Sequence, residues 1–272
     1  MNETTNDQAP KIAASSYLNT APLIWSFLYG SKKDTVELLT NEAPARCAEM
    51  LAQAAVDAAL VPVIEYQRIA DVSIVSGVCV GSRLAVRSVV LASKYDDLRR
   101  VGSVALDDSS RTSIALVKII FREFLGFEPE WRVMQPNLWA MLKDNDAALI
   151  IGDPAMKIPR SQLTVFDLAT LWREKTGLGF VFAMWMARET EAKRVQSIDF
   201  AAARDEGLDH VDDIAASYEA RLGLSRDELT SYLTRNISFT LDDELVKGLE
   251  LFFALAQKHG LISQSRDLKM LY

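Results

Sequence analysis

The pattern of apolar and polar positions near the start of the chain predicts strands that alternate with helices. Lys11 to Ala14 form a short apolar run, Thr35 to Leu39 alternate with period two, and Asp57 to Val61 form a third strand. Pro22 suits the first turn of a helix, where no N–H donor is needed, and Ala43 to Ala54 are Ala-rich with helical spacing. A β-α-β-α-β order of this kind favours a parallel sheet.

The next two β-rich runs have no helix between them. Val72 to Val80 and Val86 to Ala92 flank the tripeptide Gly81-Ser82-Arg83, so they are either joined by a tight connection or lead out of one lobe. The following segment, Ser93 to Arg100, is polar and suits a crossover between two lobes.

A second β-α-β-α-β unit follows, and the last third of the chain is helical. Ser225 to Glu228 form a capping box, which marks a helix start. We therefore expect an α/β protein in which residues 11–92 and 188–272 form one lobe, residues 93–187 form the other, and residues 1–10 are disordered. The predicted strands in this part are 103–106, 130–134, 147–151 and 180–187, and the predicted helices are 110–125, 137–143, 168–176, 191–206, 211–222, 227–235 and 242–259.

Composition and charge narrow the possible functions. The 272 residues are 49% hydrophobic and 25% charged, as in globular proteins, and a net charge of −7 argues against nucleic acid as a partner. Cys47 and Cys79 indicate neither a disulfide framework nor a metal site. The chain has no signal-peptide pattern and no apolar run of roughly 18 residues, so we expect a cytoplasmic protein without a membrane partner. No pattern specifies an oligomeric state.

Two polar loops are candidates for a ligand site, because each follows a strand and opens a helix. Ser15 to Asn19 precede the helix at Pro22, and Ser110-Arg111-Thr112-Ser113 follow the strand that ends at Leu106. Free N–H groups and hydroxyls at a helix start bind anions. The same residue types also serve as ordinary caps and turns, so the residues alone leave both interpretations open.

Other polar residues show no recognisable catalytic pattern. Gly152-Asp153, before Pro154, is interpreted as a helix or turn cap, and His210 and His259 lie in the helical last third, where core, cap or surface roles are expected. The sequence contains no metal-binding spacing, nucleophile elbow or glycine-rich phosphate loop. The residues therefore predict neither a metal nor another cofactor.

Five segments, in order, resemble the chorismate dehydratase family of the futalosine route to menaquinone. One departure from the family pattern is Gly179, where Pro is expected; it can loosen a turn but removes no chemical group. The five segments are Ser16-Tyr17-Leu18-Asn19-Thr20 with Pro22-Leu23, Ala59 to Val63 with Glu65-Tyr66, Asp107 to Ser113, Ala148 to Asp153, and Thr176 to Ala183.

The resemblance implies a fold, an activity and a set of site residues. The fold is two-lobed and similar to type II periplasmic binding proteins, with the ligand cleft between the lobes, and the activity is cofactor-free dehydration of chorismate to 3-(1-carboxyvinyloxy)benzoate. Asn19 is expected at the reacting centre, where its amide can donate to an oxyanion or to the departing hydroxyl. Arg111 can instead point to solvent or pair with Asp107 or Asp108, and Gly81-Ser82-Arg83 can be simple turn chemistry. The expected substrate-binding residues are Ser16, Ser82, Ser110, Arg111, Thr112 and Ser113.

Chorismate loses the proton at C3 and the 4-hydroxyl in this reaction, and the product gains aromaticity. We hypothesise that the substrate's own enolpyruvyl carboxylate is the base, because no catalytic His or Glu stands out in the sequence, while the protein positions the ring and stabilises charge. Two rival functions remain on sequence grounds. One is a small-anion binding or sensory protein of the same fold, and the other is the related dihydroxynaphthoate synthase, for which a histidine base in the cleft is expected.

Overall fold

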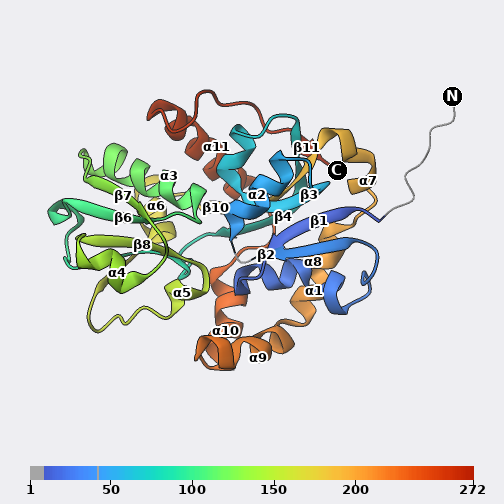
Figure 1. The fold of residues 1–272 in the computed structure, drawn as a ribbon, viewed down its shortest axis with the longest axis horizontal. Helices are drawn as coiled ribbons and strands as arrows, with labels where there is room; N and C mark the ends of the chain where they lie inside the picture. Colours follow the sequence, from blue (N-terminus) through green and yellow to red (C-terminus); the bar gives the residue numbers. More distant parts are fainter. Residues whose placement is uncertain (1–8, 42) are drawn as a thin grey trace.

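Two β-sheets divide the chain into two lobes, the first at the right of Figure 1 and the second at the left. The computed structural model describes residues 9–41 and 43–272. Of the segment 1–10 predicted to be disordered, residues 1–8 therefore lie outside the described residues. Among the residues described, no helix is long and apolar enough to cross a membrane.

The first lobe is built on a sheet with the strand order β11-β4-β10-β3-β1-β2. β1 pairs in parallel with β2 and β3, as the sequence pattern predicts, whereas β10 runs antiparallel to β3 and β4. Polar loops after β1 and β3 therefore emerge at the same edge of the sheet. The strands are β1 (Lys11–Ser15), β2 (Glu37–Asn41), β3 (Ala58–Pro62), β4 (Val72–Ser82), β10 (Phe180–Arg188) and β11 (Met270–Leu271).

The second lobe is built on a sheet with the strand order β7-β6-β8-β5-β9. β6 pairs in parallel with β7 and β8, and β5 runs antiparallel to β8 and β9. β5 and β8 are buried along their whole length, which explains their unbroken apolar sequences. The strands are β5 (Val89–Ser93), β6 (Ser103–Asp107), β7 (Glu130–Met134), β8 (Ala147–Ile151) and β9 (Thr164–Asp167).

Sheet membership corrects the lobe boundaries that the sequence predicts near residues 93 and 187. β5 belongs to the second sheet and β10 to the first, so the chain crosses between the lobes at residues 83–88 and 177–179. The polar segment 93–100 is a connection within the second lobe, and the runs 72–80 and 86–92 lead from one lobe into the other. A wholly apolar strand carries no local signal for the sheet it joins, because its partners are distant in sequence.

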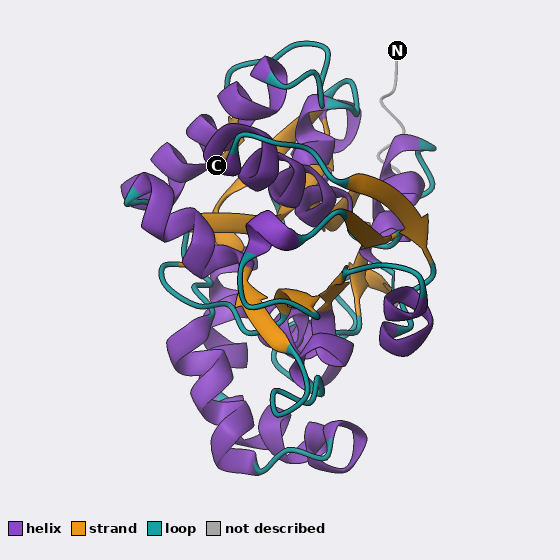
Figure 2. Cartoon of the chain, turned by 90° about the vertical axis from the view of Figure 1, so that its left-hand side faces the viewer, coloured by secondary structure: helices purple, strands orange, loops and turns teal. Residues whose placement is uncertain are grey.

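Helices surround the strands, as Figure 2 shows. In Figure 1, α9 and α10 lie below the junction of the lobes and α11 lies above it. The helices are α1 (Ala21–Tyr29), α2 (Pro44–Ala52), α3 (Arg111–Ile119), α4 (Leu138–Lys143), α5 (Gly152–Met156), α6 (Leu168–Thr176), α7 (Ala192–Val195), α8 (Phe200–Asp209), α9 (Val211–Leu222), α10 (Arg226–Ser231) and α11 (Asp243–Lys258). The short 3₁₀ segments are η1 (Leu18–Thr20), η2 (Val63–Gln67), η3 (Leu98–Arg100) and η5 (Glu189–Glu191), and π-helical turns η4 (Ile120–Leu125) and η6 (Tyr232–Asn236) extend α3 and α10.

Most predicted helices are present, and the exceptions have local causes. α6 and α9 have the predicted bounds, and the capping box at Ser225 is confirmed. The predicted helix 191–206 is instead divided into α7 and α8, because the Asp199 side chain accepts a hydrogen bond from Ala202 N (2.9 Å) and starts a new helix. β9 and β11 are strands that the sequence pattern does not predict. Cys47 and Cys79 are both buried, and neither forms a disulfide.

α1 is held in place by close packing against α8. A Cβ atom added at Gly207 would lie 1.9 Å from the backbone oxygen of Pro22, so only glycine allows the two helices to approach this closely. The preceding loop, residues 15–20, is thereby fixed at the edge of the first sheet.

Candidate functional site

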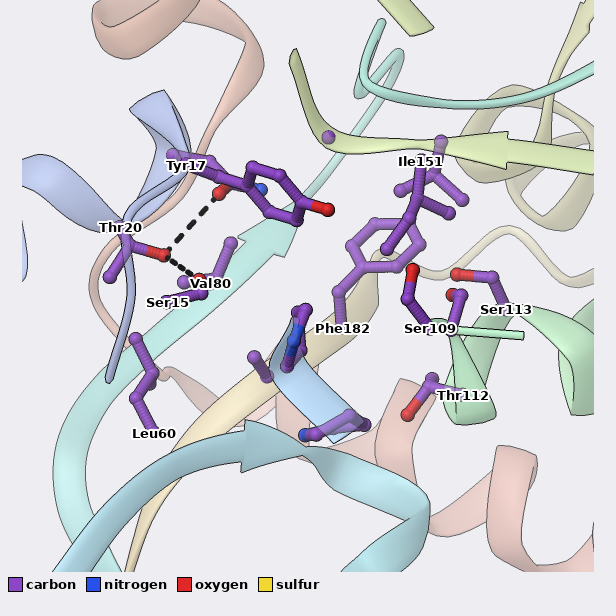
Figure 3. A pocket seen from close by; sticks show the side chains of 17 residues that line it. Ser15, Tyr17, Thr20, Leu60, Val80, Ser109, Thr112, Ser113, Ile151 and Phe182 are labelled. Carbon is purple, nitrogen blue, oxygen red and sulfur yellow. Dashed lines mark hydrogen bonds between the residues drawn. The ribbon is translucent and has the colours of Figure 1, made fainter. Parts of the chain in front are cut away.

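A pocket between the lobes collects polar side chains from both of them (Figure 3). The empty space between its walls, counted out to its open mouth, is about 530 Å³. Each of the five family-like segments contributes to its wall, for example through Tyr17, Leu60, Ser109, Ile151 and Phe182. Residues that are distant in sequence therefore converge on one space.

The first-lobe side of the pocket is the loop between β1 and α1. The hydroxyls of Ser15 and Thr20 form a hydrogen bond of 2.8 Å, seen as a dashed line in Figure 3. Thr20 Oγ1 also donates to Asn19 Oδ1 over a long 3.5 Å. The amide nitrogen of Asn19 is therefore the group that remains for a ligand.

The second-lobe side is the start of α3. Ser110 is the N-cap residue, but its side chain makes no capping hydrogen bond, and the first helical bond runs from Ile114 N to Ser110 O (3.0 Å). The N–H groups of Arg111, Thr112 and Ser113 consequently lack acceptors within the helix. Together with the helix dipole, they favour a negatively charged ligand group at this end of the pocket.

Direct contacts join the two lobes around the pocket. Thr112 Oγ1 accepts a hydrogen bond from Ile64 N (3.3 Å), and Asp153 Oδ1 accepts one from Leu18 N (2.9 Å). Asp153 also pairs with Arg221 of α9. Asp153 therefore does not act as the cap that the sequence predicted but joins the two lobes through Leu18. Its charge is neutralised by Arg221, outside the pocket lining.

Gly152 allows the ring of Tyr17 to cover the pocket. Its φ is +65°, and an added Cβ would lie 2.8 to 2.9 Å from three ring atoms of Tyr17. An L side chain would be strained by the backbone and would also collide with the ring. Gly152 therefore leaves the space that the Tyr17 ring occupies, a role that the sequence interpretation of Gly152-Asp153 as a cap did not include.

The pocket walls are uncharged. Among the described residues that line it, none is Asp, Glu, Lys, Arg or His, so the polar lining consists of Ser, Thr, Asn and Tyr side chains. Arg111 lies outside the lining, where its guanidinium donates to Glu65 Oε2 (3.0 Å) and Glu49 Oε1 (3.1 Å) of the first lobe. Its partners are therefore neither Asp107 nor Asp108.

The structure brings together four of the seven predicted site residues. Asn19, Ser110, Thr112 and Ser113 line the pocket, and Ser16, Ser82 and Arg111 do not. Ser16 turns its backbone oxygen toward α9, where it accepts from Tyr218 Oη (2.9 Å) and from Arg221 (3.0 Å).

Ser82 lies at the buried end of β4, paired in register with Phe180. Its hydroxyl has no hydrogen-bond partner among the described residues. Its predicted position on a turn facing the cleft is not what the structure shows, because β4 continues through Ser82.

Several lining residues were not predicted from sequence. Tyr17 and Thr20 lie inside the first family-like segment, and Ser109 and Gly152 lie inside the third and fourth, but their roles depend on distances across the cleft. The two histidines lie elsewhere. His210 stacks on Trp25 with ring centroids 3.8 Å apart, and His259 Nε2 lies 2.7 Å from Glu123 Oε2. In the part of the chain that the structure describes, no group of three or more His, Cys, Asp and Glu side chains could hold a metal.

Comparison with solved structures identifies the fold. A protein from Archaeoglobus fulgidus superimposes with a TM-score of 0.75 at 16% identity, covering 94% of this chain and 100% of that one. The periplasmic aliphatic sulphonate binding protein of Escherichia coli superimposes with a TM-score of 0.64 at 18% identity, covering 96% and 90%. The predicted periplasmic-binding-protein-like fold is therefore confirmed.

Comparison of sequences identifies the family. A chorismate dehydratase of Thermus thermophilus is 32% identical over 173 residues, which are 57% of this chain and 63% of that protein. A chorismate dehydratase of Campylobacter jejuni is 30% identical over 138 residues, 50% of this chain and 48% of that protein. The matches thus span about half to two thirds of these relatives' lengths. A profile of the family described as menaquinone biosynthesis matches residues 10–258, and the chain belongs to this family.

Proposed function

We propose that the protein is a chorismate dehydratase, a carbon-oxygen lyase that eliminates water from chorismate to give 3-(1-carboxyvinyloxy)benzoate. The observation that carries the proposal is an uncharged pocket, in a member of the menaquinone biosynthesis family, with hydrogen-bond donors on two opposite sides. The similarity to proteins named chorismate dehydratase supports chorismate as the substrate.

The pocket suits a ligand with two carboxylates. The start of α3 offers N–H groups and hydroxyls to one carboxylate, and the loop at Asn19 offers an amide on the opposite lobe. The apolar side chains of Leu60, Ile151 and Phe182 in the lining are suited to contact the ring of such a ligand. Neutral donors can hold both ends of a dianion without a fixed cation.

The residue inventory supports a base supplied by the substrate. Dehydration breaks the C3–H and C4–O bonds, forms the aromatic ring, and releases the proton and hydroxide as water. Since the described lining contains no carboxylate, imidazole or amine, the enolpyruvyl carboxylate beside C3 is the group placed to accept the proton. Asn19 then stabilises the departing hydroxyl or the developing charge on the ring carboxylate.

Incubation with chorismate tests the proposal. The product is aromatic and can be followed by absorbance and identified by chromatography with mass spectrometry. Asn19→Ala should lower kcat by about 10²-fold, the loss seen when one transition-state donor is removed, while weakening binding much less. His210→Gln, a change outside the pocket, is the control and should keep wild-type turnover.

The outcomes separate the rival functions. Chorismate that is bound and returned unchanged by folded protein would establish a binding or sensory module instead. Loss of turnover in folded His210→Gln or His259→Gln would favour the histidine-base chemistry expected of dihydroxynaphthoate synthase.

A further inference from the structure

A buried carboxylate lies directly behind the pocket. Asp107 ends β6 with 1% of its surface exposed, and its Oδ1 accepts hydrogen bonds from Ser109 Oγ (2.5 Å) and Ser109 N (3.0 Å). Its Oδ2 accepts a longer bond from Ile151 N (3.4 Å). Within the described residues, no Lys, Arg or His forms an ion pair with this carboxylate. These hydrogen bonds stabilise the ionised carboxylate, whereas its burial without a cation favours the protonated form.

Ser109 connects this carboxylate to the pocket. Its side chain lines the pocket next to Thr112 and Ser113, on the side opposite Thr20 (Figure 3). A serine hydroxyl has one hydrogen, and an ionised carboxylate can only accept. While Asp107 is ionised, the Ser109 hydrogen is committed to it, and the hydroxyl presents only lone pairs to the pocket. If Asp107 is protonated, the carboxyl donates to Ser109 Oγ, and the hydroxyl hydrogen becomes available to a ligand.

The two states differ in their affinity for an anion. Lone pairs repel a substrate carboxylate, whereas a hydroxyl donor forms a charge-assisted hydrogen bond with it. We propose that Asp107 takes up one proton from solvent when the dicarboxylate substrate binds, which turns the Ser109 hydroxyl from an acceptor into a donor toward a substrate carboxylate. This inference rests on the proposed function. Asp107 acts through Ser109 as a positioning residue, and the proton returns to solvent when the product leaves.

The surroundings of Asp107 favour proton uptake. Burial raises the pKa of Asp107, the hydrogen bonds from Ser109 and Ile151 oppose that rise, and the charge of Asp108 adds to it. Charged groups on the adjoining elements are engaged elsewhere. Arg111 of α3 pairs with Glu65 and Glu49, Asp153 of α5 pairs with Arg221, and Arg132 of β7 pairs with Glu130. Among the residues that the structure describes, no neighbouring cation therefore pairs with Asp107 to keep it ionised when a dianion enters the pocket.

Calorimetry can count the protons. The reaction product, 3-(1-carboxyvinyloxy)benzoate, is titrated into the whole protein near pH 7.5 in two buffers with different ionisation enthalpies. We expect uptake of up to one proton per bound ligand, and an affinity that falls by up to tenfold per pH unit above the pKa of Asp107. Asp107→Asn should abolish the uptake and flatten the pH dependence.

A matched control is available next to this residue. Asp108 carries a carboxylate that accepts from Gln135 Nε2 (2.6 Å) on an exposed part of the same loop. Asp108→Asn makes the same chemical change but leaves Asp107 and its bond to Ser109 in place. It removes only the smallest of the contributions to the raised pKa of Asp107, so proton uptake should persist. Ser109→Ala removes the hydroxyl that bonds to Asp107 and should also abolish the proton uptake. This second variant tests the proposal even if Asp107→Asn does not fold.

The outcomes distinguish this inference from the function on which it rests. A protein that neither converts chorismate nor binds the product refutes both. A protein that converts chorismate but takes up no proton, or takes up as many protons after Ser109→Ala as before, refutes only the role of Asp107.

Discussion

Removing the Arg111 guanidinium should weaken substrate binding although no group is lost from the pocket lining. In Arg111→Ala, α3 loses its hydrogen bonds to Glu65 Oε2 (3.0 Å) and Glu49 Oε1 (3.1 Å) of the first lobe. Because these bonds join the lobes, their loss destabilises the closed arrangement relative to an open one. A ligand that requires closure then binds with a higher apparent Kd.

Burial of the partners sets the magnitude. The Glu65 side chain is 3% exposed, and breaking such a buried pair costs about 3–5 kcal/mol when the remaining charge has no partner. Glu65 keeps Arg68 at 3.0 Å in the variant, so we expect about 2 kcal/mol, within the range for a hydrogen bond to a charged group. This corresponds to a roughly 30-fold rise in Kd. The Glu49 bond is more exposed and adds less than about 1 kcal/mol.

The assay is product binding by calorimetry together with steady-state kinetics on chorismate. Arg46→Ala is the matched control, because Arg46 bonds to Glu49 at 3.1 Å within the first lobe and bridges no cleft. We expect a raised KM with little change in kcat for Arg111→Ala, and wild-type values for Arg46→Ala.

A double variant separates closure from direct contact with the substrate. If Arg111 acts through Glu65, then in a Glu65→Gln background the change Arg111→Ala should have only a small further effect. A full 30-fold effect in that background would show that Arg111 reaches the substrate, and equal affinities of Arg111→Ala and wild type would refute the closure argument.

Three further changes test the pocket. Thr112→Val keeps the shape but leaves Ile64 N without its acceptor and removes a donor to the ligand. The loss of about 1.5–3 kcal/mol should raise Kd roughly 10- to 150-fold in a binding assay; unchanged Kd would argue against carboxylate binding at this helix start. Gly152→Ala places a side chain at a residue with φ +65° and against the Tyr17 ring. The backbone strain should lower the free energy of unfolding in urea by roughly 1–2 kcal/mol. The loss of kcat/KM, converted to free energy, should be far larger. Burial raises the pKa of Asp107, so at pH values between its unfolded-state and folded-state pKa the folded protein binds one more proton than the unfolded chain. The free energy of unfolding of the wild type should therefore fall as the pH rises through this range. Asp107→Asn has no such group and should not show this fall.

Local patterns predicted the elements, and long-range pairing decided their arrangement. The strand at 147–151 and the helix at 168–176 could be assigned from their own residues, since apolar spacing and caps are local signals. The lobe to which 86–92 belongs depends on pairing with β8 and β9, more than fifty residues later in the chain, so no local signal existed. The break before α8 was in principle visible, because Asp199 is a good N-cap residue inside an otherwise helical pattern.

The candidate site divides in the same way. Asn19 and the helix start at Ser110 could be found because a strand, a polar loop and a helix N-terminus follow one another in sequence. Ser82 could not be placed, because the end of β4 extends into what reads as a turn. The contribution of Gly152 depends on its close approach to the ring of Tyr17, which lies on the other lobe. The neighbouring pair Asp153 and Leu18, 135 residues apart in sequence, is hydrogen-bonded across the same cleft.

The position of Arg111 links two family-like segments and bears on the proposed chemistry. Glu65 in one segment holds the guanidinium of Arg111 in the other, so the first turn of α3 is fixed against the first lobe while the cation stays out of the pocket. A cation inside the pocket would bind the carboxylates of the ground state and of the transition state alike, which lowers KM without raising kcat. Neutral N–H groups and hydroxyls at the same helix start can instead be placed where charge develops during elimination. The ion pair therefore positions the proposed substrate-binding surface without adding its charge to it.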